Sequence, residues 1–282
     1  MVENRPVLNF LSHLVMIVGV VVVVFPVYLA FIASTRGPND FYSGVVPLLP
    51  GPHMIENYWA MLTNGMSTSG APPIGPMMLN SLIMAVGVAV GKIAISILSA
   101  FAIVYFRFPL RTLAFWLIFI TLMLPVEVRI VPTFKVVADL GLLNNYGGLI
   151  VPLLASATAT FLFRQFFLTV PEELMEAARV DGAGPMKFFR DILLPLSVTN
   201  IAALFVILFI LGWNQYLWPL IVTTNPDQYT VVMGIKRMAD VADSYPQWHT
   251  VMAAVILAGL PPVLVIIGMQ RLFVKGLTET EK

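Results

Sequence analysis

Long apolar stretches dominate the chain, and its polar residues gather between them. Six stretches reach or approach the roughly 20 apolar residues that a helix needs to cross a bilayer. They are Leu14–Ser34, Met77–Phe106, Thr112–Ile130, Tyr146–Phe167, Ile201–Thr223 and Val251–Phe273. The third is the shortest, since Glu127 and Arg129 follow its clean apolar run. The strands of a membrane barrel would alternate apolar and polar residues, and these runs do not. Helices satisfy their own backbone hydrogen bonds in hydrocarbon, so these runs are expected to be helical. The pattern predicts an all-α polytopic membrane protein with six transmembrane helices.

Composition supports a membrane location and narrows the chemistry. Of the 282 residues, 59% are hydrophobic and only 11% are charged, which is far from the mix of a soluble domain. The chain has no cysteine, so disulfides, thiolate metal sites and cysteine nucleophiles are excluded. His13, His53 and His249 are isolated and show no metal-ligand spacing. A net charge of +1 gives no reason to expect nucleic acid as a partner.

The distribution of Lys and Arg predicts the orientation in the membrane. An even number of spans puts both termini on one side. On that side lie Arg5, Arg107, Arg111, Arg164, Arg179, Lys187, Arg190, Arg271, Lys275 and Lys282; on the other lie Arg36, Arg129, Lys135, Lys236 and Arg237. Because cytoplasmic loops carry the excess of positive charge, both termini are expected in the cytoplasm. The first apolar run has no convincing cleavage site, so we interpret it as a retained signal anchor.

The chain offers no sign of a second domain. The two longest external stretches, Thr35–Pro76 and Asn225–Thr250, are too short for a catalytic domain. We find no internal repeat and no low-complexity linker. One membrane domain over residues 1–282 is therefore the expected organisation.

A polar loop at residues 169–195 carries signals of two short cytoplasmic helices. Thr169 followed by Glu172 fits a capping box, and Pro171 is tolerated in a first helical turn. Gly182 suits the left-handed position that ends a helix. A second helix is then expected from the next proline, Pro185, to Leu194, before Pro195 and the next span.

The same loop matches a known pattern without a gap. Its residues Glu176, Ala177, Ala178, Gly182, Ile192, Leu194 and Pro195 resemble the EAA motif of ABC importer permeases. The resemblance implies a coupling helix that docks in a groove of a cytoplasmic ATPase and passes its closure to the membrane helices. It also implies that the two alanines allow close approach, that Gly182 makes the turn and that Glu176 offers a charge to the partner.

The resemblance extends over nearly the whole chain. Residues 105–111, 140–149 and 270–276 resemble carbohydrate-importer permeases of the maltose type. Residues 3–6, 98–103, 119–130, 155–167 and 212–219 are most similar to the second permease subunit of sn-glycerol-3-phosphate importers.

This likeness implies a subunit of the bacterial inner membrane that works by alternating access. The partners that it implies are a homologous second permease, two copies of the ATPase and a periplasmic or extracellular solute-binding protein. ATP and Mg²⁺ would be bound by the ATPase, and this chain would hold no cofactor. Gly87, Gly91 and Lys92 superficially resemble a phosphate-binding loop, but the spacing is wrong and Ile93 replaces the required Ser or Thr. We interpret the two glycines as a helix-packing face.

Charged residues within the predicted spans are candidates for the solute pathway. Lys92 lies near the middle of the second span, where an unpaired cation is costly, and Arg129 lies near the outer end of the third. Both would attract a phosphorylated solute. The alternative is a structural pairing of Lys92 with Glu127 or with a carboxylate of the sister subunit. Asn80, at the outer end of the second span, is a further polar candidate.

Asn214 and Gln215 in the fifth span form a second pair of candidates. Their amides lie among Trp213, Tyr216 and Trp218, a combination suited to a polyol. Interfacial aromatic belts and amide bridges between helices are the structural alternative.

Several alternatives for the function remain open. The solute could equally be a glycerophosphodiester, a polyol or another sugar. A secondary transporter should show repeat symmetry and paired ion sites, but the sequence has no internal repeat. A membrane enzyme should show converging catalytic groups, but the three histidines are isolated.

Overall fold

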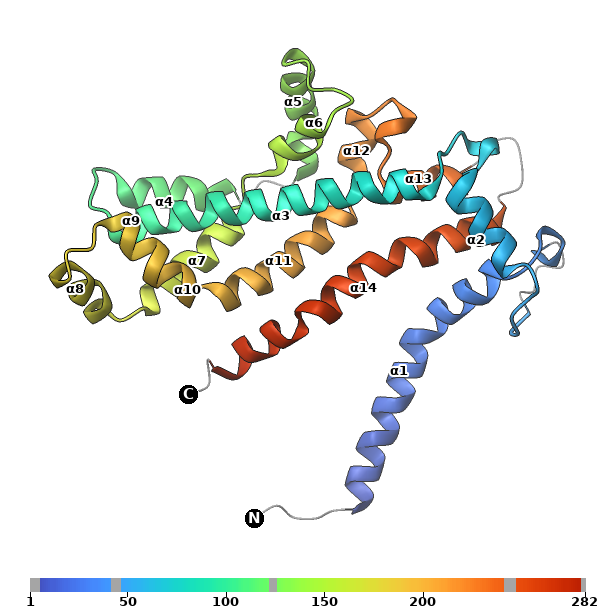
Figure 1. The fold of residues 1–282 in the computed structure, drawn as a ribbon, viewed down its shortest axis with the longest axis horizontal. Helices are drawn as coiled ribbons and strands as arrows, with labels where there is room; N and C mark the ends of the chain where they lie inside the picture. Colours follow the sequence, from blue (N-terminus) through green and yellow to red (C-terminus); the bar gives the residue numbers. More distant parts are fainter. Residues whose placement is uncertain (1–5, 42–46, 122–125, 241–246, 280–282) are drawn as a thin grey trace. The chain divides into compact units, whose positions relative to one another are not determined.

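The computed structural model describes residues 6–41, 47–121, 126–240 and 247–279. Within these ranges the regular structure is helical, apart from one isolated β-bridge between Met66 and Ala71 (Figure 1). The prediction of an all-α fold is therefore confirmed. The chain forms two compact units, residues 1–76 with 234–260 and residues 77–233 with 261–282. The expectation of a single domain over 1–282 stays a prediction.

The first unit contains α1 (Pro6–Ser34), a 3₁₀ turn (Pro38–Phe41), α2 (Met54–Thr63), a second 3₁₀ turn (Ser67–Ser69), and parts of α3, α13 and α14. Its buried Asn57, on α2, donates from Nδ2 to the carbonyls of Ser34 at 2.9 Å and Arg36 at 2.8 Å. The hydroxyls of Ser34 and Tyr58 lie 3.0 Å apart. These bonds fix the end of α1 against α2, because Asn57 satisfies carbonyls that the helix end leaves unpaired.

The second unit is built around the long helix α3 (Ile74–Tyr105). The helices that follow are α4 (Arg111–Ile120), α5 (Val126–Asp139), α6 (Tyr146–Ile150), a 3₁₀ turn (Val151–Leu153), α7 (Ala157–Thr169) and α8 (Glu172–Val180). The chain continues with α9 (Pro185–Phe188), a π-helical segment (Phe189–Leu193), α10 (Leu194–Leu196), α11 (Val198–Trp213), α12 (Leu217–Val222), a 3₁₀ turn (Pro226–Gln228), α13 (Val231–Ala239) and α14 (Trp248–Glu279).

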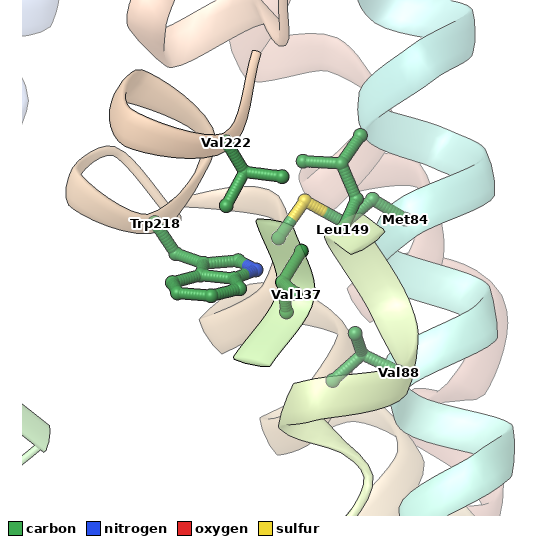
Figure 2. Packing of buried hydrophobic residues seen from close by; sticks show 6 residues of the cluster. All are labelled: Met84, Val88, Val137, Leu149, Trp218 and Val222. Atoms are coloured by element: carbon green, nitrogen blue, oxygen red, sulfur yellow. The ribbon is translucent and has the colours of Figure 1, made fainter. Parts of the chain in front are cut away.

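A dry cluster holds α3, α5, α6 and α12 together. Figure 2 shows Met84 and Val88 of α3 beside side chains from the other three helices. Those side chains are Val137, Leu149, Trp218 and Val222. Trp218 also donates from Nε1 to the carbonyl of Gly148 at 3.1 Å. The indole therefore fills the core with its rings and satisfies its polar nitrogen at the same time.

Three helices among the described residues are long and apolar enough to cross a bilayer, in α1, α3 and α14. Two more crossings qualify only as bent pairs. Residues 146–153 join 157–169 at 49°, and residues 185–196 join 198–213 at 70°.

The third predicted span is divided between two helices. Its first part is α4, which at 10 residues is half the length of a crossing. Its second part is α5, which carries Arg129, Lys135 and Asp139 and is therefore too polar to span alone. Residues 122–125 between these helices lie outside the described part of the chain.

The prediction that Gly87 and Gly91 form a packing face is confirmed. A Cβ atom added to Gly87 would lie 2.7 Å from Cδ1 of Ile150, and one added to Gly91 would meet Cδ2 of Leu154. A third close approach was not expected: a Cβ on Gly212 of α11 would lie 2.9 Å from Cα of Ala85. Small residues thus let two segments pack closely on α3.

Candidate coupling loop and solute pathway

The N-cap of α8, the first helix of the predicted coupling loop, lies two residues later than expected. Pro171 is the N-cap residue and no side chain caps the helix. The hydroxyl of Thr169 instead donates to the carbonyl of Phe166 at 2.7 Å, at the end of α7. The predicted capping box is therefore wrong, because the threonine hydroxyl bonds to a carbonyl of the preceding helix instead of accepting from an N–H of α8. Glu172 and Glu173 do lie in the first turn, where carboxylates favour the helix dipole.

The turn after α8 has the predicted geometry. Gly182 has a φ of +72°, its N–H donates to the carbonyl of Arg179 at 3.0 Å, and Ala183 donates to Ala178 at 2.8 Å. These two bonds define a Schellman cap, which needs a left-handed residue at this position. The role of Gly182 as the turn residue is confirmed.

The second coupling helix starts where predicted and ends later. Gly184 is the N-cap and Pro185 the first helical residue, as expected. The helix includes a π-helical segment at Phe189–Leu193. It does not stop at Leu194 but continues through Pro195 to Leu196. Proline lacks an N–H and its ring crowds the carbonyl four residues earlier, so a wider turn upstream accommodates it. The predicted end is therefore wrong by two residues.

Exposure separates the motif residues into two groups. Glu176 and Ala177 are exposed on α8, and so is Val180 at 87%. Ala178 is buried, with 5% of its surface exposed. Ala178 therefore packs within its own chain, while Glu176 and Ala177 face outward.

An aromatic cluster that sequence reasoning missed ties the loop to the membrane helices. Phe188 and Phe189, both buried, pack against the last turns of α3. Tyr105 meets Phe188 edge-on at 5.3 Å and Phe101 lies tilted against Phe189 at 4.9 Å between ring centroids. The Tyr105 hydroxyl also donates to the carbonyl of Phe167 at 3.3 Å. Two adjacent phenylalanines in an otherwise polar loop were the available signal. The loop is therefore packed directly against the end of α3.

The structure brings the two cationic pathway candidates together. Lys92 is half-buried on α3, Arg129 is exposed on α5, and the two lie within electrostatic reach of each other. Among the described side chains Lys92 forms no ion pair. The side chain of Glu127 lies outside the described residues, so its pairing with Lys92 stays a prediction.

The other candidate pair lies at a helix break. Helix α11 ends at Trp213, and α12 begins only at Leu217, so the predicted fifth span is interrupted. Asn214 is exposed at that break and Gln215 is half-buried. Their neighbours Trp213 and Trp218 are buried in the core, with 2% and 3% of their surfaces exposed. These two tryptophans therefore do not offer a surface on which a polyol could stack beside the amides.

Asn80 has a structural role that accounts for all of its amide contacts. Only 4% of its surface is exposed, and its Nδ2 donates to the carbonyls of Asp227 at 2.7 Å and Tyr229 at 3.0 Å. Its Oδ1 accepts from the hydroxyl of Tyr146 at 2.7 Å. Asn80 thus joins three segments of the second unit and has little capacity left for a solute.

Comparisons with known proteins agree with this architecture. The family of binding-protein-dependent transport system inner membrane components matches residues 92–279. The chain is 57% identical to the sn-glycerol-3-phosphate transport system permease proteins UgpE of Brucella melitensis and Agrobacterium fabrum, and 56% identical to that of Escherichia coli O1:K1. Each alignment covers 282 residues and 100% of both chains.

A solved structure supports the fold. The bacterial ABC transporter involved in the import of the acidic polysaccharide alginate aligns with a TM-score of 0.81 at 19% identity, over 96% of this chain and 98% of that one. The resemblance to ABC importer permeases is thereby confirmed. The protein is a multi-pass permease of the inner membrane, and it is not the ATPase of its transporter. The chain therefore belongs to the family of inner membrane components of binding-protein-dependent transport systems.

Proposed function

We propose that this chain is the permease subunit of an ATP-driven importer and forms half of the translocation pathway for sn-glycerol-3-phosphate. The full-length identity of 57% to permeases named for that solute is the observation that carries the proposal. The other half of the pathway is a homologous second permease. Two copies of a cytoplasmic ATPase bind ATP and Mg²⁺, and a solute-binding protein delivers the solute from outside.

Coupling to the ATPase runs through α8 and the aromatic cluster. The exposed Glu176 and Ala177 offer α8 a surface for the groove of the ATPase. The Schellman turn at Gly182 connects α8 rigidly to the second coupling helix. Phe188 and Phe189 then pass the displacement to α3 through their contacts with Phe101 and Tyr105. Ile192, Leu194 and Pro195 continue this helix toward α11, so closure of the ATPase switches the membrane helices between inward-facing and outward-facing states.

A phosphorylated solute fits the charges on the pathway. A cation within a membrane is costly unless it is paired or faces water, and Lys92 has Arg129 as its charged neighbour. An anion between the two cations would reduce their mutual repulsion and receive charge-assisted hydrogen bonds from both. The amides of Asn214 and Gln215, at the break between α11 and α12, are suited to the glycerol hydroxyls.

Uptake by the reconstituted importer tests the proposal. Proteoliposomes receive sn-glycerol-3-phosphate, a glycerophosphodiester or a neutral disaccharide, each with the cognate binding protein, with and without internal ATP. We expect only sn-glycerol-3-phosphate to enter and to stimulate ATP hydrolysis. Uptake of the disaccharide alone would leave the family intact but refute the solute, and uptake without ATP would favour a secondary transporter.

Variants of the two cations test the pathway itself. Lys92→Gln and Arg129→Gln should each raise the half-saturating solute concentration about tenfold or more, as expected when one charged hydrogen-bond partner is lost. Lys135→Gln is the matched control, because Lys135 lies on the same helix as Arg129 but pairs with Asp139 at 3.0 Å. Equal effects of all three variants would contradict a solute contact, and normal transport in both test variants would move it to the sister permease.

A further inference from the structure

The loop between α3 and α4 forms a hollow of about 680 Å³, lined by residues 107–113. It contains two exposed arginines, Arg107 and Arg111. The sequence has no carboxylate from residue 57 to residue 126, and among the described side chains neither arginine forms an ion pair. The charge bias of the chain makes this end of the two helices cytoplasmic. The hollow is therefore a basic site at the level of the inner-leaflet headgroups.

A third arginine extends this basic site from α7. The Arg164 guanidinium carbon lies 4.2 Å from the centroid of the Phe115 ring. Phe115 follows Arg111 by four residues, so both lie on one face of α4. Within the described residues, the buried Nε of Arg164 has no hydrogen-bond partner. Arg111 has only a long bond, 3.4 Å from Nη1 to the carbonyl of Phe106. The exposed Arg107 and Arg111 thus keep most of their guanidinium donors available to an anion, whereas Nε of Arg164 is buried.

The surroundings of the basic site are apolar and exposed. Leu110, Leu113 and Trp116 have 73%, 50% and 52% of their surfaces exposed. All three belong to α4 or to the residue that precedes it. A free anion would gain nothing from these side chains, whereas an acyl chain attached to the anion would cover them.

We propose that Arg107 and Arg111, with Arg164 beside them, bind the phosphodiester headgroup of an anionic phospholipid whose acyl chain lies along α4. The match is one of charge and surroundings: a basic site beside exposed apolar side chains on the cytoplasmic side suits an anionic headgroup. This site is separate from the coupling loop and the solute pathway, and it does not depend on which solute the importer carries.

Photocrosslinking in the assembled importer tests the proposal. The reporter is Leu113→p-benzoylphenylalanine, in vesicles of phosphatidylcholine that contain a trace of tagged phosphatidylglycerol or tagged phosphatidylcholine. We expect phosphatidylglycerol to be crosslinked at least fivefold more, since each surface arginine contributes roughly fivefold at low salt. The same reporter at Val22, on the exposed face of α1, should show no such preference. Equal labelling of the two lipids at Leu113 would overturn the proposal.

Charge variants and a soluble competitor sharpen the result. Arg107→Gln with Arg111→Gln should remove the preference, whereas Arg107→Lys with Arg111→Lys should keep most of it. Lys187→Gln, a loss of charge outside the hollow, should leave it unchanged. A preference that survives the double glutamine variant would overturn the proposal. So would loss of lipid labelling in the presence of inorganic phosphate at constant ionic strength, because the site would then bind a free anion.

Discussion

Gly182 offers the sharpest test of the coupling loop, because its substitution strains one backbone angle and touches nothing else. Its φ of +72° is needed for the Schellman cap, and no atom lies within 4 Å of the place where a Cβ would stand. Within this chain, the direct effect of Gly182→Ala is therefore confined to the backbone. A matched control lies two residues away: Gly184 is equally open, but its φ of −71° suits alanine without strain.

The size of the effect follows from the left-handed conformation. An L-residue other than glycine loses about 1–2 kcal/mol there, which lowers the population of the turn by about 5- to 30-fold relative to other conformations. Asparagine tolerates this conformation better, and a β-branched residue tolerates it worst. We therefore expect a graded series in which Gly182→Asn is mildest, Gly182→Ala is intermediate and Gly182→Val abolishes uptake.

The assay is uptake and ATP hydrolysis by the reconstituted importer, with membrane insertion checked by protease protection. Gly182→Ala should reduce uptake by about 5- to 30-fold and lower the amount of solute carried per ATP, because the ATPase no longer moves α8 and the second helix as one body. Gly184→Ala should transport within twofold of the unmodified protein. Full uptake by Gly182→Val, or equal losses in the two alanine variants, would refute the assigned role of this turn.

Further predictions concern packing, coupling and the pathway. Asn80→Ala should lower the thermal midpoint of the complex in a melting assay, since the carbonyls of Asp227 and Tyr229 lose their donor and the loss at the buried Tyr229 carbonyl costs about 1–3 kcal/mol. Gly87→Val should destabilise it by about 1–3 kcal/mol, whereas Gly259→Val, with nothing within 4 Å, should cost less in the same assay. Phe188→Ala should uncouple ATP hydrolysis from uptake and Phe188→Leu should restore part of the coupling; unchanged coupling in both would contradict the aromatic route. Added salt should weaken solute stimulation less in Lys92→Gln than in the unmodified importer, which a titration of ATPase activity measures.

Hydrophobic run length predicted the long helices well and the broken ones poorly. α1, α3 and α14 follow directly from uninterrupted apolar sequence. The interruption at Asn214 did not, because run length counts composition, whereas a helix ends where side chains and tertiary contacts satisfy its last carbonyls. The prediction of one continuous third span missed the division into α4 and α5 for a related reason. The polar residues of α5 end the apolar run, but nothing in the run marks the start of a new helix.

Short-range chemistry in the coupling loop was predictable to the extent that one conformation dominated. Gly182 and Pro185 have few alternatives, so their positions in the turn and in the second helix followed from residue type. The Thr169 hydroxyl can accept from an N–H of the next helix or donate to a carbonyl of the helix before it, and the sequence does not say which of the two it does. The long-range roles of Asn80 and Phe188 depend on partners up to 149 residues away, and the local sequence does not identify those partners.

The wide π turn at Phe189–Leu193 has a consequence for the bearing of the coupling helix. A π turn holds one more residue than an α turn, so everything before it is rotated by about 100° and displaced by about 1.5 Å along the axis. Under the proposed function, Pro195 thus sets which side of α8 faces the ATPase. In Pro195→Ala the turn is free to tighten, and cysteine crosslinks from α8 should then shift to different positions on the ATPase; unchanged crosslinks would show that the angle is held by other contacts.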